Sequence, residues 1–352
     1  MSRPSPSRAV AEPIGSRPAG GRARRRLLAL AAAVAVLALL SVASILLGSA
    51  LLSPGEVWHA LTTPDGSVNR STVVGLRVPR TELGVIVGAA LGVAGALMQG
   101  LTRNPLADPG ILGVNAGAGF AVALGVVAFG VTRIQQYLPF AFLGAIGAAV
   151  LVYAIAAGGR AGPTPLRLTL VGVALGAVLT GISRTLALLD EQTFDRMRFW
   201  NAGTIADRPA GTIGTIWPWV VAGLVLAALC LPALNTMALG DDVATSMGVP
   251  VPLVRAGVIL SVTLLCGAAT AAVGPIAFLG LMVPHAVRFV TGPDLRWVVA
   301  FTVVVAPALL LLADIVGRLI VYPAELQVGV VVSLIGAPVL VALVRRSRVV
   351  AS

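Results

Sequence analysis

The chain has 352 residues, of which 57% are hydrophobic and 11% charged, and its mean hydropathy is +0.96. Soluble domains carry about 25% charged residues, so this composition excludes a soluble globular protein and predicts an all-α polytopic membrane protein. The net charge is +11 and every basic side chain is an arginine. These arginines lie in the N-terminal segment and at the ends of apolar runs, which argues against a nucleic-acid-binding surface.

The first 26 residues are rich in proline, serine and arginine and contain too few apolar residues to form a core. We expect residues 1–26 to be a disordered basic tail. The apolar run Leu27–Leu52 that follows is too long for the hydrophobic part of a signal peptide, so it predicts an uncleaved first span. The arginines before it are expected to keep the tail in the cytoplasm. Residues 27–348 are expected to form a single transmembrane domain.

Further apolar runs follow the polar, turn-rich segment Ser53–Arg80, which we expect to be the first external connection. About 20 apolar residues suffice to cross a bilayer, so the runs predict about ten helices with both termini in the cytoplasm. The run that begins at Ile276 is too short to cross alone and suggests a half-helix. The runs are Leu83–Leu101, Leu112–Val131, Tyr137–Ala157, Leu168–Leu189, Ile213–Leu234, Ala256–Ala272, Ile276–Val283, Trp297–Leu319 and Val328–Val344.

The stretch Leu76–Phe120 is the one around which we expect the other helices to be organised. Glycines recur in it at three- and four-residue spacing, which places them on one stripe of a helix where neighbouring backbones can come close. A polar turn punctuated by prolines then leads straight back into apolar sequence, as in a packed membrane hairpin. The stripe consists of Gly84, Gly88, Gly92 and Gly95, and the turn motif contains Asn104, Pro105, Asp108, Pro109 and Gly110.

Three arginines are expected at the external ends of spans, against the usual bias of basic residues toward the cytoplasm. Arg77 and Arg80 precede one span and Arg318 closes another. A single arginine at such a boundary is often an anchor that extends to the lipid headgroups. Three on one side favour a docking site for an acidic partner, held by charge-assisted pairs.

The loop Leu239–Pro250 has the pattern of a short amphipathic helix outside the bilayer. Asp241 and Asp242 suit its N-terminal end, and Gly248 suits the position just after its C-terminus. Val243 and Met247 share a face through their four-residue spacing. That apolar face has to be covered, either by the rest of the chain, by the membrane surface, or by a motor subunit in the cytoplasm.

The segment Gly274–Arg288 contains prolines and glycines that break a membrane helix, which is tolerated where protein or a water-filled cavity satisfies the freed backbone groups. Asp314 is an acid inside a span, and Arg318 one turn later is its expected partner. We interpret this intramembrane ion pair as primarily structural. The sequence shows no P-loop, no catalytic triad and no cluster of metal ligands, so neither an enzyme nor a metal site is expected.

Four stretches together resemble the FecCD family, the permease subunits of ABC importers for iron-siderophore complexes, haem and cobalamin. They occur in the family's order and cover most of the region from Leu76 to Arg346. They are RVPRTELGVIVGAALGVAGALMQGLTRNPLADPGILGVNAGAG, ALGDDVATSMGV, GPIAFLGLMVPHAVRFVTGPD, and LLLADIVGRLI with AELQVGVVVSLIGAPVLVALVRR. The resemblance implies a type II ABC importer permease domain that works as a dimer in the cytoplasmic membrane, with the translocation path between the subunits.

The resemblance also implies partners. Two ATPase subunits would bind the cytoplasmic face and hold the ATP, so the permease itself needs no cofactor. An external binding protein would dock through glutamates on the arginines at the positions of Arg77, Arg80 and Arg318. The family's coupling helices correspond to the loop that contains Asp241, Asp242, Val243, Ala244, Met247 and Gly248. The second permease subunit can be an identical copy or a paralogue.

Two alternatives stay open at this point. The same architecture can import cobalamin or haem, because the apolar runs carry no cargo-specific ligand. A secondary transporter driven by an ion gradient belongs to a different class, which often has several intramembrane acids and inverted repeats. Asp314 is the only clear internal acid in the predicted spans, and no internal repeat is evident. An ATP-driven iron-siderophore importer is therefore the preferred interpretation.

Overall fold

The computed structural model describes residues 19–48, 52–131, 134–158, 164–322 and 324–350. All regular elements in these ranges are helices. Seven stretches are long and apolar enough to cross a bilayer, and three shorter apolar helices complete a set of ten. The prediction of an all-α protein with about ten membrane helices is therefore confirmed. The long ones are α1 (Ala19–Leu46), α4 (Val78–Thr102) with the residues before it, α6 (Ile134–Ala157), α7 (Pro165–Leu189), α9 (Thr212–Met237), α11 (Val251–Val273) and α13 (Leu295–Ile320); the shorter ones are α5 (Val114–Phe129), α12 (Leu279–Thr291) and the apolar part, Val328–Ala342, of α14 (Val328–Val350).

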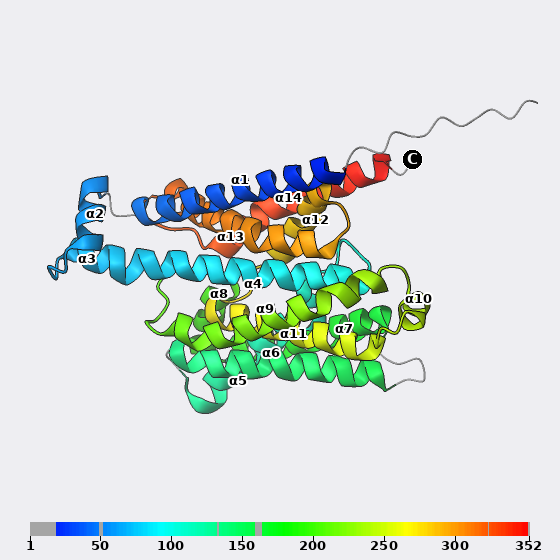
Figure 1. Ribbon diagram of the computed structural model, residues 1–352. Coiled ribbons are helices and arrows are strands. Elements are labelled where there is room, and N and C mark those ends of the chain that lie inside the picture. The colour runs from blue at the N-terminus through cyan, green and yellow to red at the C-terminus, as the bar shows by residue number, and fades with distance from the viewer. Residues whose placement is uncertain (1–18, 49–51, 132–133, 159–163, 323, 351–352) are drawn as a thin grey trace, which may run out of the picture.

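Helix α4 lies in the middle of the bundle (Figure 1). Helices α1, α12, α13 and α14 lie on one side of it, and α5, α6, α7, α9 and α11 lie on the other. Its contacts with both α13 and α11 join the two groups. Most of its side chains are buried, whereas α1 has almost no fully buried side chains. The stretch around which the chain was expected to be organised is thus its central helix.

The glycine stripe allows α4 to occupy the centre of the bundle, because glycine has no side chain to separate the helix backbones that meet there. A Cβ atom added at Gly88 would lie 2.5 Å from the Cα of Pro307, and one added at Gly95 would lie 1.8 Å from the carbonyl oxygen of Gly280. The Gly280 carbonyl is available because Pro284, four residues later, has no N–H to donate to it. The close packing expected of the whole stripe is confirmed, with Gly84, Gly88 and Gly92 against α13 and Gly95 against α12.

The described part of the expected N-terminal tail is helical and not disordered. Helix α1 begins at Ala19, so residues 19–26 of the expected disordered tail are helical. Alanine and arginine both have high helix propensity, and the apolar run that follows provides a helix for these residues to extend. The rest of the expected tail, residues 1–18, lies outside the described residues.

The segment Ser53–Arg80 is not the irregular connection that its polar composition suggested. It forms α2 (Pro54–Thr62), with a capping box between Ser53 and Glu56, then α3 (Val68–Thr72) and a π-helical turn, η1 (Val73–Arg77), that runs directly into α4. The helix is therefore continuous over Val68–Thr102. Pro79 cannot donate to the carbonyl of Gly75, and the π-helical turn at this point accommodates the missing hydrogen bond.

Two further differences concern short helices. The predicted half-helix at Ile276–Val283 begins later, at Leu279, because residues 274–278 are not helical and Phe278 has a positive φ of 65°. The helix then continues through Pro284 to Thr291. The sequence interpretation missed α8 (Glu191–Asn201), a charged helix between α7 and α9 that is capped by the side chain of Asp190.

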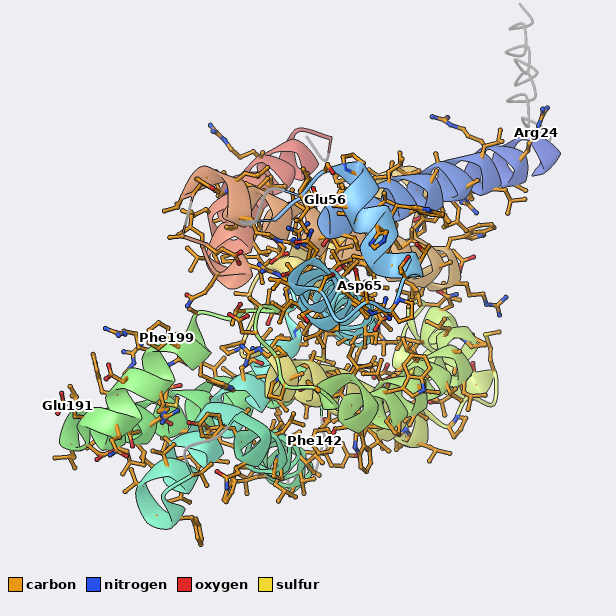
Figure 2. All side chains as sticks on the ribbon, turned by 90° about the vertical axis from the view of Figure 1, so that its left-hand side faces the viewer. Arg24, Glu56, Asp65, Phe142, Glu191 and Phe199 are labelled. Atoms are coloured by element: carbon orange, nitrogen blue, oxygen red, sulfur yellow. The ribbon has the colours of Figure 1, made fainter. Side chains whose placement is uncertain are left out.

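The two ends of the bundle carry different elements. Helices α2 and α3 lie at one end, the α2 end, and α10 (Asp241–Ser246) lies at the opposite end, the α10 end, together with the start of α1 and the end of α14 (Figure 1). Viewed toward the α2 end, Glu56 of α2 and nearby Asp65 lie over the centre of the bundle, and Glu191 and Phe199 of α8 lie at its edge (Figure 2).

Candidate functional site: an arginine pocket and an exposed helix at opposite ends

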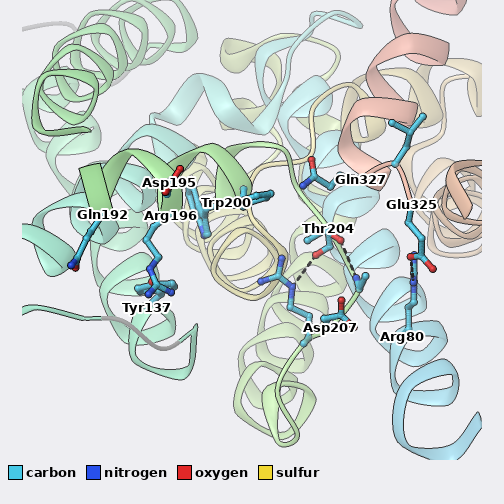
Figure 3. A pocket seen from close by; sticks show the side chains of 14 residues that line it. Arg80, Tyr137, Gln192, Asp195, Arg196, Trp200, Thr204, Asp207, Glu325 and Gln327 are labelled. Atoms are coloured by element: carbon cyan, nitrogen blue, oxygen red, sulfur yellow. Dashed lines mark hydrogen bonds and ion pairs between the residues drawn. The ribbon is translucent and has the colours of Figure 1, made fainter. Parts of the chain in front are cut away.

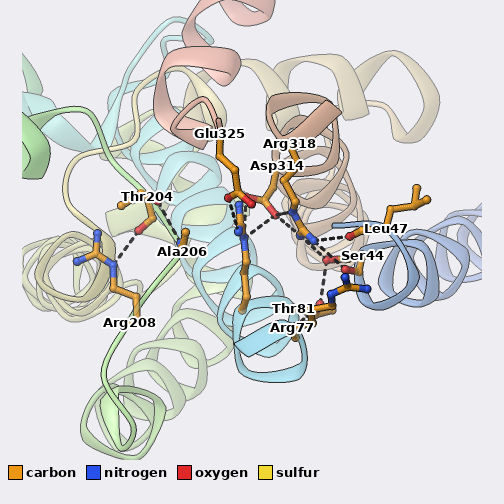
Figure 4. Close-up of polar contacts among 11 residues, drawn as sticks. Ser44, Leu47, Arg77, Thr81, Thr204, Ala206, Arg208, Asp314, Arg318 and Glu325 are labelled. Atoms are coloured by element: carbon orange, nitrogen blue, oxygen red, sulfur yellow. Dashed lines mark hydrogen bonds and ion pairs between the residues drawn. The ribbon is translucent and has the colours of Figure 1, made fainter. Parts of the chain in front are cut away.

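Asp314 on α13 binds two arginines from different helices. Arg318, one turn later, donates from Nε at 2.9 Å, as the sequence predicted. Arg80 of α4 donates to both carboxylate oxygens, at 2.7 and 3.0 Å, and its other amino group pairs with Glu325 at 2.7 Å (Figure 4). Asp314 and Arg318 are 1% and 2% exposed, so the expected intramembrane ion pair is present and is shared with Arg80.

Arg77 and Arg318 also bind the C-terminal end of α1. The last carbonyls of a helix have no intrahelical donor. Arg77 donates to the carbonyls of Ile45 and Leu46 at 2.9 and 2.8 Å. Arg318 donates to those of Ser44 and Leu47 at 2.8 and 2.7 Å. Guanidinium charges also suit the negative end of a helix dipole, so these two arginines fix α1 to the bundle.

All three predicted arginines meet at one small cavity, the arginine pocket, with a volume of about 270 Å³. Two carboxylates share its wall, so the arginines outnumber the acids there by one. Arg77 and Arg318 are 5% and 2% exposed, so little of either side chain is accessible from outside. The pocket is lined by Gly48, Thr72, Leu76, Arg77, Arg80, Asp207, Arg318 and Glu325.

A larger cavity of about 700 Å³ adjoins the arginine pocket, since Arg80, Asp207 and Glu325 line both (Figure 3). Its wall mixes three arginines and three carboxylates with the aromatic rings of Tyr137, Phe199 and Trp200. Burial lowers the pKa of Arg208, in the loop before α9, to about 10, and Asp207 beside it opposes that shift. Arg208 therefore remains charged at neutral pH.

At the opposite end, Asp241 joins α10 to two other parts of the chain. Its carboxylate accepts from Arg103, in the turn after α4, and from Arg255 of α11. The sequence interpretation had placed Asp241 and Asp242 only with respect to the helix dipole. Gly248 ends α10 as predicted: its φ is +81°, and the N–H groups of Gly248 and Val249 bond back to Thr245 and Ala244.

The apolar face of α10 is open. Met247 is 63% exposed and Val243 is 44% exposed, whereas Ala244 is fully buried against the bundle. Of the alternatives that the sequence left open, packing of this face on the rest of the same chain is therefore ruled out among the described residues. A flat apolar face of this kind suits a partner or a membrane surface.

The turn motif is held by side-chain hydrogen bonds to its own backbone. Asn104 accepts from the N–H of Leu106 at 2.9 Å, and Asp108 accepts from the N–H of Gly110 at 2.7 Å. Arg103 has a positive φ of 51°. Pro105 and Pro109, which directly follow Asn104 and Asp108, fix the backbone φ at their own positions. The motif thus holds Arg103 where it reaches Asp241 of α10.

Sequence reasoning singled out all three arginines, but of their contacts it predicted only the pair of Arg318 with Asp314. It missed Arg80 as a partner of Asp314, and it missed Ser44 and Thr81, whose hydroxyls are 2.9 Å apart between α1 and α4. It gave no role to Glu325, which pairs with Arg80. The spacing of one helical turn could reveal only the Asp314–Arg318 pair, whereas Arg80 and Asp314 are 234 positions apart.

Ten apolar helices around a glycine-packed centre, with a polar pocket at one end and an open amphipathic helix at the other, define a polytopic membrane transport protein. The chain belongs to the FecCD transport family, whose model matches residues 36–346.

Two relatives and one solved structure show the extent of this similarity. The chain is 46% identical to the ferric enterobactin transport system permease protein FepD of Escherichia coli K12, over 93% of this chain and 98% of that protein. It is 37% identical to the iron(3+)-hydroxamate import system permease protein FhuB of Bacillus subtilis 168, over 91% and 83% of the two chains. A metal-chelate type ABC transporter in an inward-facing conformation superposes with a TM-score of 0.78, at 26% identity, over 91% of this chain and 99% of that one.

Proposed function

We propose that this chain is the permease subunit of an ATP-driven ABC importer that carries iron(III)-siderophore complexes across the cytoplasmic membrane. The observation that carries this proposal is similarity over almost the whole chain to permeases named for ferric enterobactin and iron-hydroxamate import. The chain itself catalyses no reaction and needs no cofactor. Hydrolysis of ATP takes place on separate subunits.

Uptake of radioiron tests this function directly. Cells that lack the gene should lose uptake of iron-loaded siderophores and regain it when the gene is restored. Labelled haem and cobalamin are measured in parallel. Loss of haem or cobalamin uptake with intact iron uptake would contradict the cargo, and no change in a strain that also lacks related permeases would contradict the function.

The proposed assembly contains a second permease subunit, identical or paralogous, two cytoplasmic ATPase subunits and an external binding protein. We place the α2 end outside the cell and the α10 end in the cytoplasm. The arginines at the start of α1 and at the end of α14 support this orientation, because basic residues are enriched in cytoplasmic segments. Both termini are then cytoplasmic. Apart from membrane lipid, no further partner is proposed, and nucleic acid is not one.

The arginine pocket is the proposed docking site for the binding protein. Arg80, at 13% side-chain exposure, faces Glu325, which is 27% exposed and lies at the mouth of the pocket. An incoming acidic side chain can take the place of Glu325 and pair with Arg80. Arg77 and Arg318 would act mainly through their charge, since both guanidinium groups are committed to α1 and to Asp314.

A negative charge at the rim of this pocket should weaken docking. Leu76 lines the pocket and is 56% exposed, so Leu76→Asp leaves the buried ion pairs intact. We expect the affinity for the loaded binding protein to fall about tenfold, with a smaller difference at high salt. Binding to the transporter in nanodiscs measures it. Val68→Asp, an exposed position on α3 outside the pocket, is the matched control, and equal affinities for the two variants would contradict the docking site.

Helix α10 is the proposed contact with the ATPase. Its open face consists of Val243 and Met247, and its base is fixed by the pairs of Asp241 with Arg103 and Arg255. A movement of the ATPase applied to this face is therefore passed to α4 and α11 through ion pairs rather than through a flexible loop. ATP binding would in this way shift the permease between outward-open and inward-open forms.

Removing the apolar contact should separate hydrolysis from transport. We expect Met247→Asp to lower ATP-driven uptake at least tenfold, because it places a charge in an apolar contact, while the ATPase subunits keep their own hydrolytic activity. Uptake and hydrolysis are measured together in proteoliposomes. Thr245→Ala, on the opposite face of the same helix, is the control and should transport normally. Normal uptake by Met247→Asp would exclude this coupling role.

A further inference from the structure

A third cavity, of about 510 Å³, lies between α5, α7 and α8, away from the arginine pocket. Arg184 is the only charged side chain among the described residues that line it, and no carboxylate lines it. The larger cavity at the α2 end, by contrast, balances three arginines with three acids. The cavity at Arg184 therefore has a positive potential that its own wall does not cancel.

Arg184 is unusual for an arginine inside a membrane span. It lies five residues before the end of α7. Within the described part of the chain it makes no ion pair and no hydrogen bond. Ionised side chains within spans are rare and typically face a water-filled path or a partner. An arginine this close to the end of a helix can also extend to lipid headgroups, and the experiment below separates these two cases.

The wall contains other polar side chains that can donate hydrogen bonds, apart from Ser183, whose hydroxyl already donates to the carbonyl of Leu179 at 2.7 Å. Asn115 uses its side-chain oxygen inside the bundle, where Thr270 donates to it at 2.8 Å, and its amide nitrogen lies 3.2 Å from the position that a Cβ added at Gly110, another lining residue, would take. Thr180 and Asn201 are exposed and line the same cavity. A guanidinium with amide and hydroxyl donors, and without a competing carboxylate, suits a ligand rich in anionic oxygen atoms.

The geometry points to this cavity as a transit site for negatively charged metal chelates, with Arg184 as the residue that favours anionic over neutral cargo. This inference rests on the proposed function and adds the charge class of the cargo. A ferric complex with three catecholate groups is trianionic, whereas one with three hydroxamate groups is neutral. These two complexes therefore test the charge preference at similar size and with the same metal.

The experiment uses the complete transporter, with its binding protein and ATPase subunits, in vesicles of zwitterionic lipid. Uptake of radioiron is compared for a tris-catecholate and a tris-hydroxamate complex. We expect Arg184→Gln to lower uptake of the anionic complex about tenfold and to leave the neutral one unchanged. Arg184→Lys should retain most of the anionic uptake. Asn201→Asp, which adds a carboxylate to the same wall, should act in the same direction as Arg184→Gln.

Arg167→Gln is the matched control, since Arg167 lies near the other end of α7 and outside the cavity. Wild-type transporter that moves neither complex would refute the proposed function. If the wild type takes up the anionic complex and Arg184→Gln takes it up equally well, only the inference is overturned. The same holds if Arg184→Gln loses uptake of both complexes to the same extent. A defect that occurs only when anionic phospholipid is added to the vesicles would assign Arg184 to lipid headgroups and also overturn it.

Discussion

Replacement of Asp314 by alanine should destabilise the protein by about 3–5 kcal/mol, because it leaves buried arginines without their counter-charge. Arg80 and Arg318 both bind this carboxylate, and Arg318 is almost fully buried. The expected consequence is a lower melting temperature in detergent and a smaller amount of folded protein in the membrane. Thermal unfolding of the purified protein measures it.

Two further variants separate the buried charge from a general effect of mutation. Arg318→Met combined with Asp314→Ala removes both charges of one pair and should recover part of the lost stability, since two apolar groups cost less than one unpaired charge. Asp195→Ala, which removes an exposed pair with Arg198 on α8, should have no measurable effect. A melting temperature of Asp314→Ala equal to that of Asp195→Ala would contradict the role of Asp314.

Replacement of Gly95 by alanine should be among the most damaging single-methyl changes in the described part of the protein. The new Cβ would lie 1.8 Å from the carbonyl oxygen of Gly280, and that neighbour is backbone that cannot rotate away. Helices α4 and α12 would have to separate, and we expect a loss of about 3 kcal/mol or more. The yield of folded protein and its melting temperature in detergent are the measurements.

Gly147→Ala is the appropriate comparison. Gly147 is also within an apolar helix, α6, but apart from its own stretch of helix no described atom lies within 4 Å of the position that its Cβ would take. Alanine has a higher helix propensity than glycine by about 1 kcal/mol, so this variant should be at least as stable as the wild type. Equal yields and melting temperatures for Gly95→Ala and Gly147→Ala would show that the close contact with Gly280 is not the reason for glycine at position 95.

The membrane helices could be predicted from the sequence because burial in lipid demands long apolar runs, and these runs can be recognised locally. The glycine stripe could be predicted for a similar reason, since spacing alone shows which residues share a helix face. The elements that the sequence did not predict are helices of polar or charged composition, because they lack the apolar runs by which membrane helices are recognised. Segment 53–80 is polar, yet it forms α2 and α3 and the π-helical turn, and the charged helix α8 lies outside any apolar run.

The contacts of the arginines could not be predicted from the sequence in the same way. The pair of Asp314 and Arg318 follows from helical spacing, but the pair of Arg80 and Asp314 depends on which helices are neighbours. The hydrogen bonds from Arg77 and Arg318 to α1 depend on where α1 ends within the bundle. Such contacts are set by the packing of α4 against α13, which is encoded only in the complementary shapes of the two helix surfaces.

The binding of α1 by Arg318 has a consequence for biogenesis. Helix α1 leaves the ribosome before the other membrane helices described here, but Arg318 follows Ser44 by 274 positions. At roughly 5–20 residues per second, synthesis of the intervening chain takes on the order of 15–50 s. During this interval α1 is already in the bilayer, while its terminal carbonyls still lack one of their two arginines. Helix α1 is thus made well before one of the residues that fix it in place, and a chain interrupted before α13 leaves it unattached to that helix.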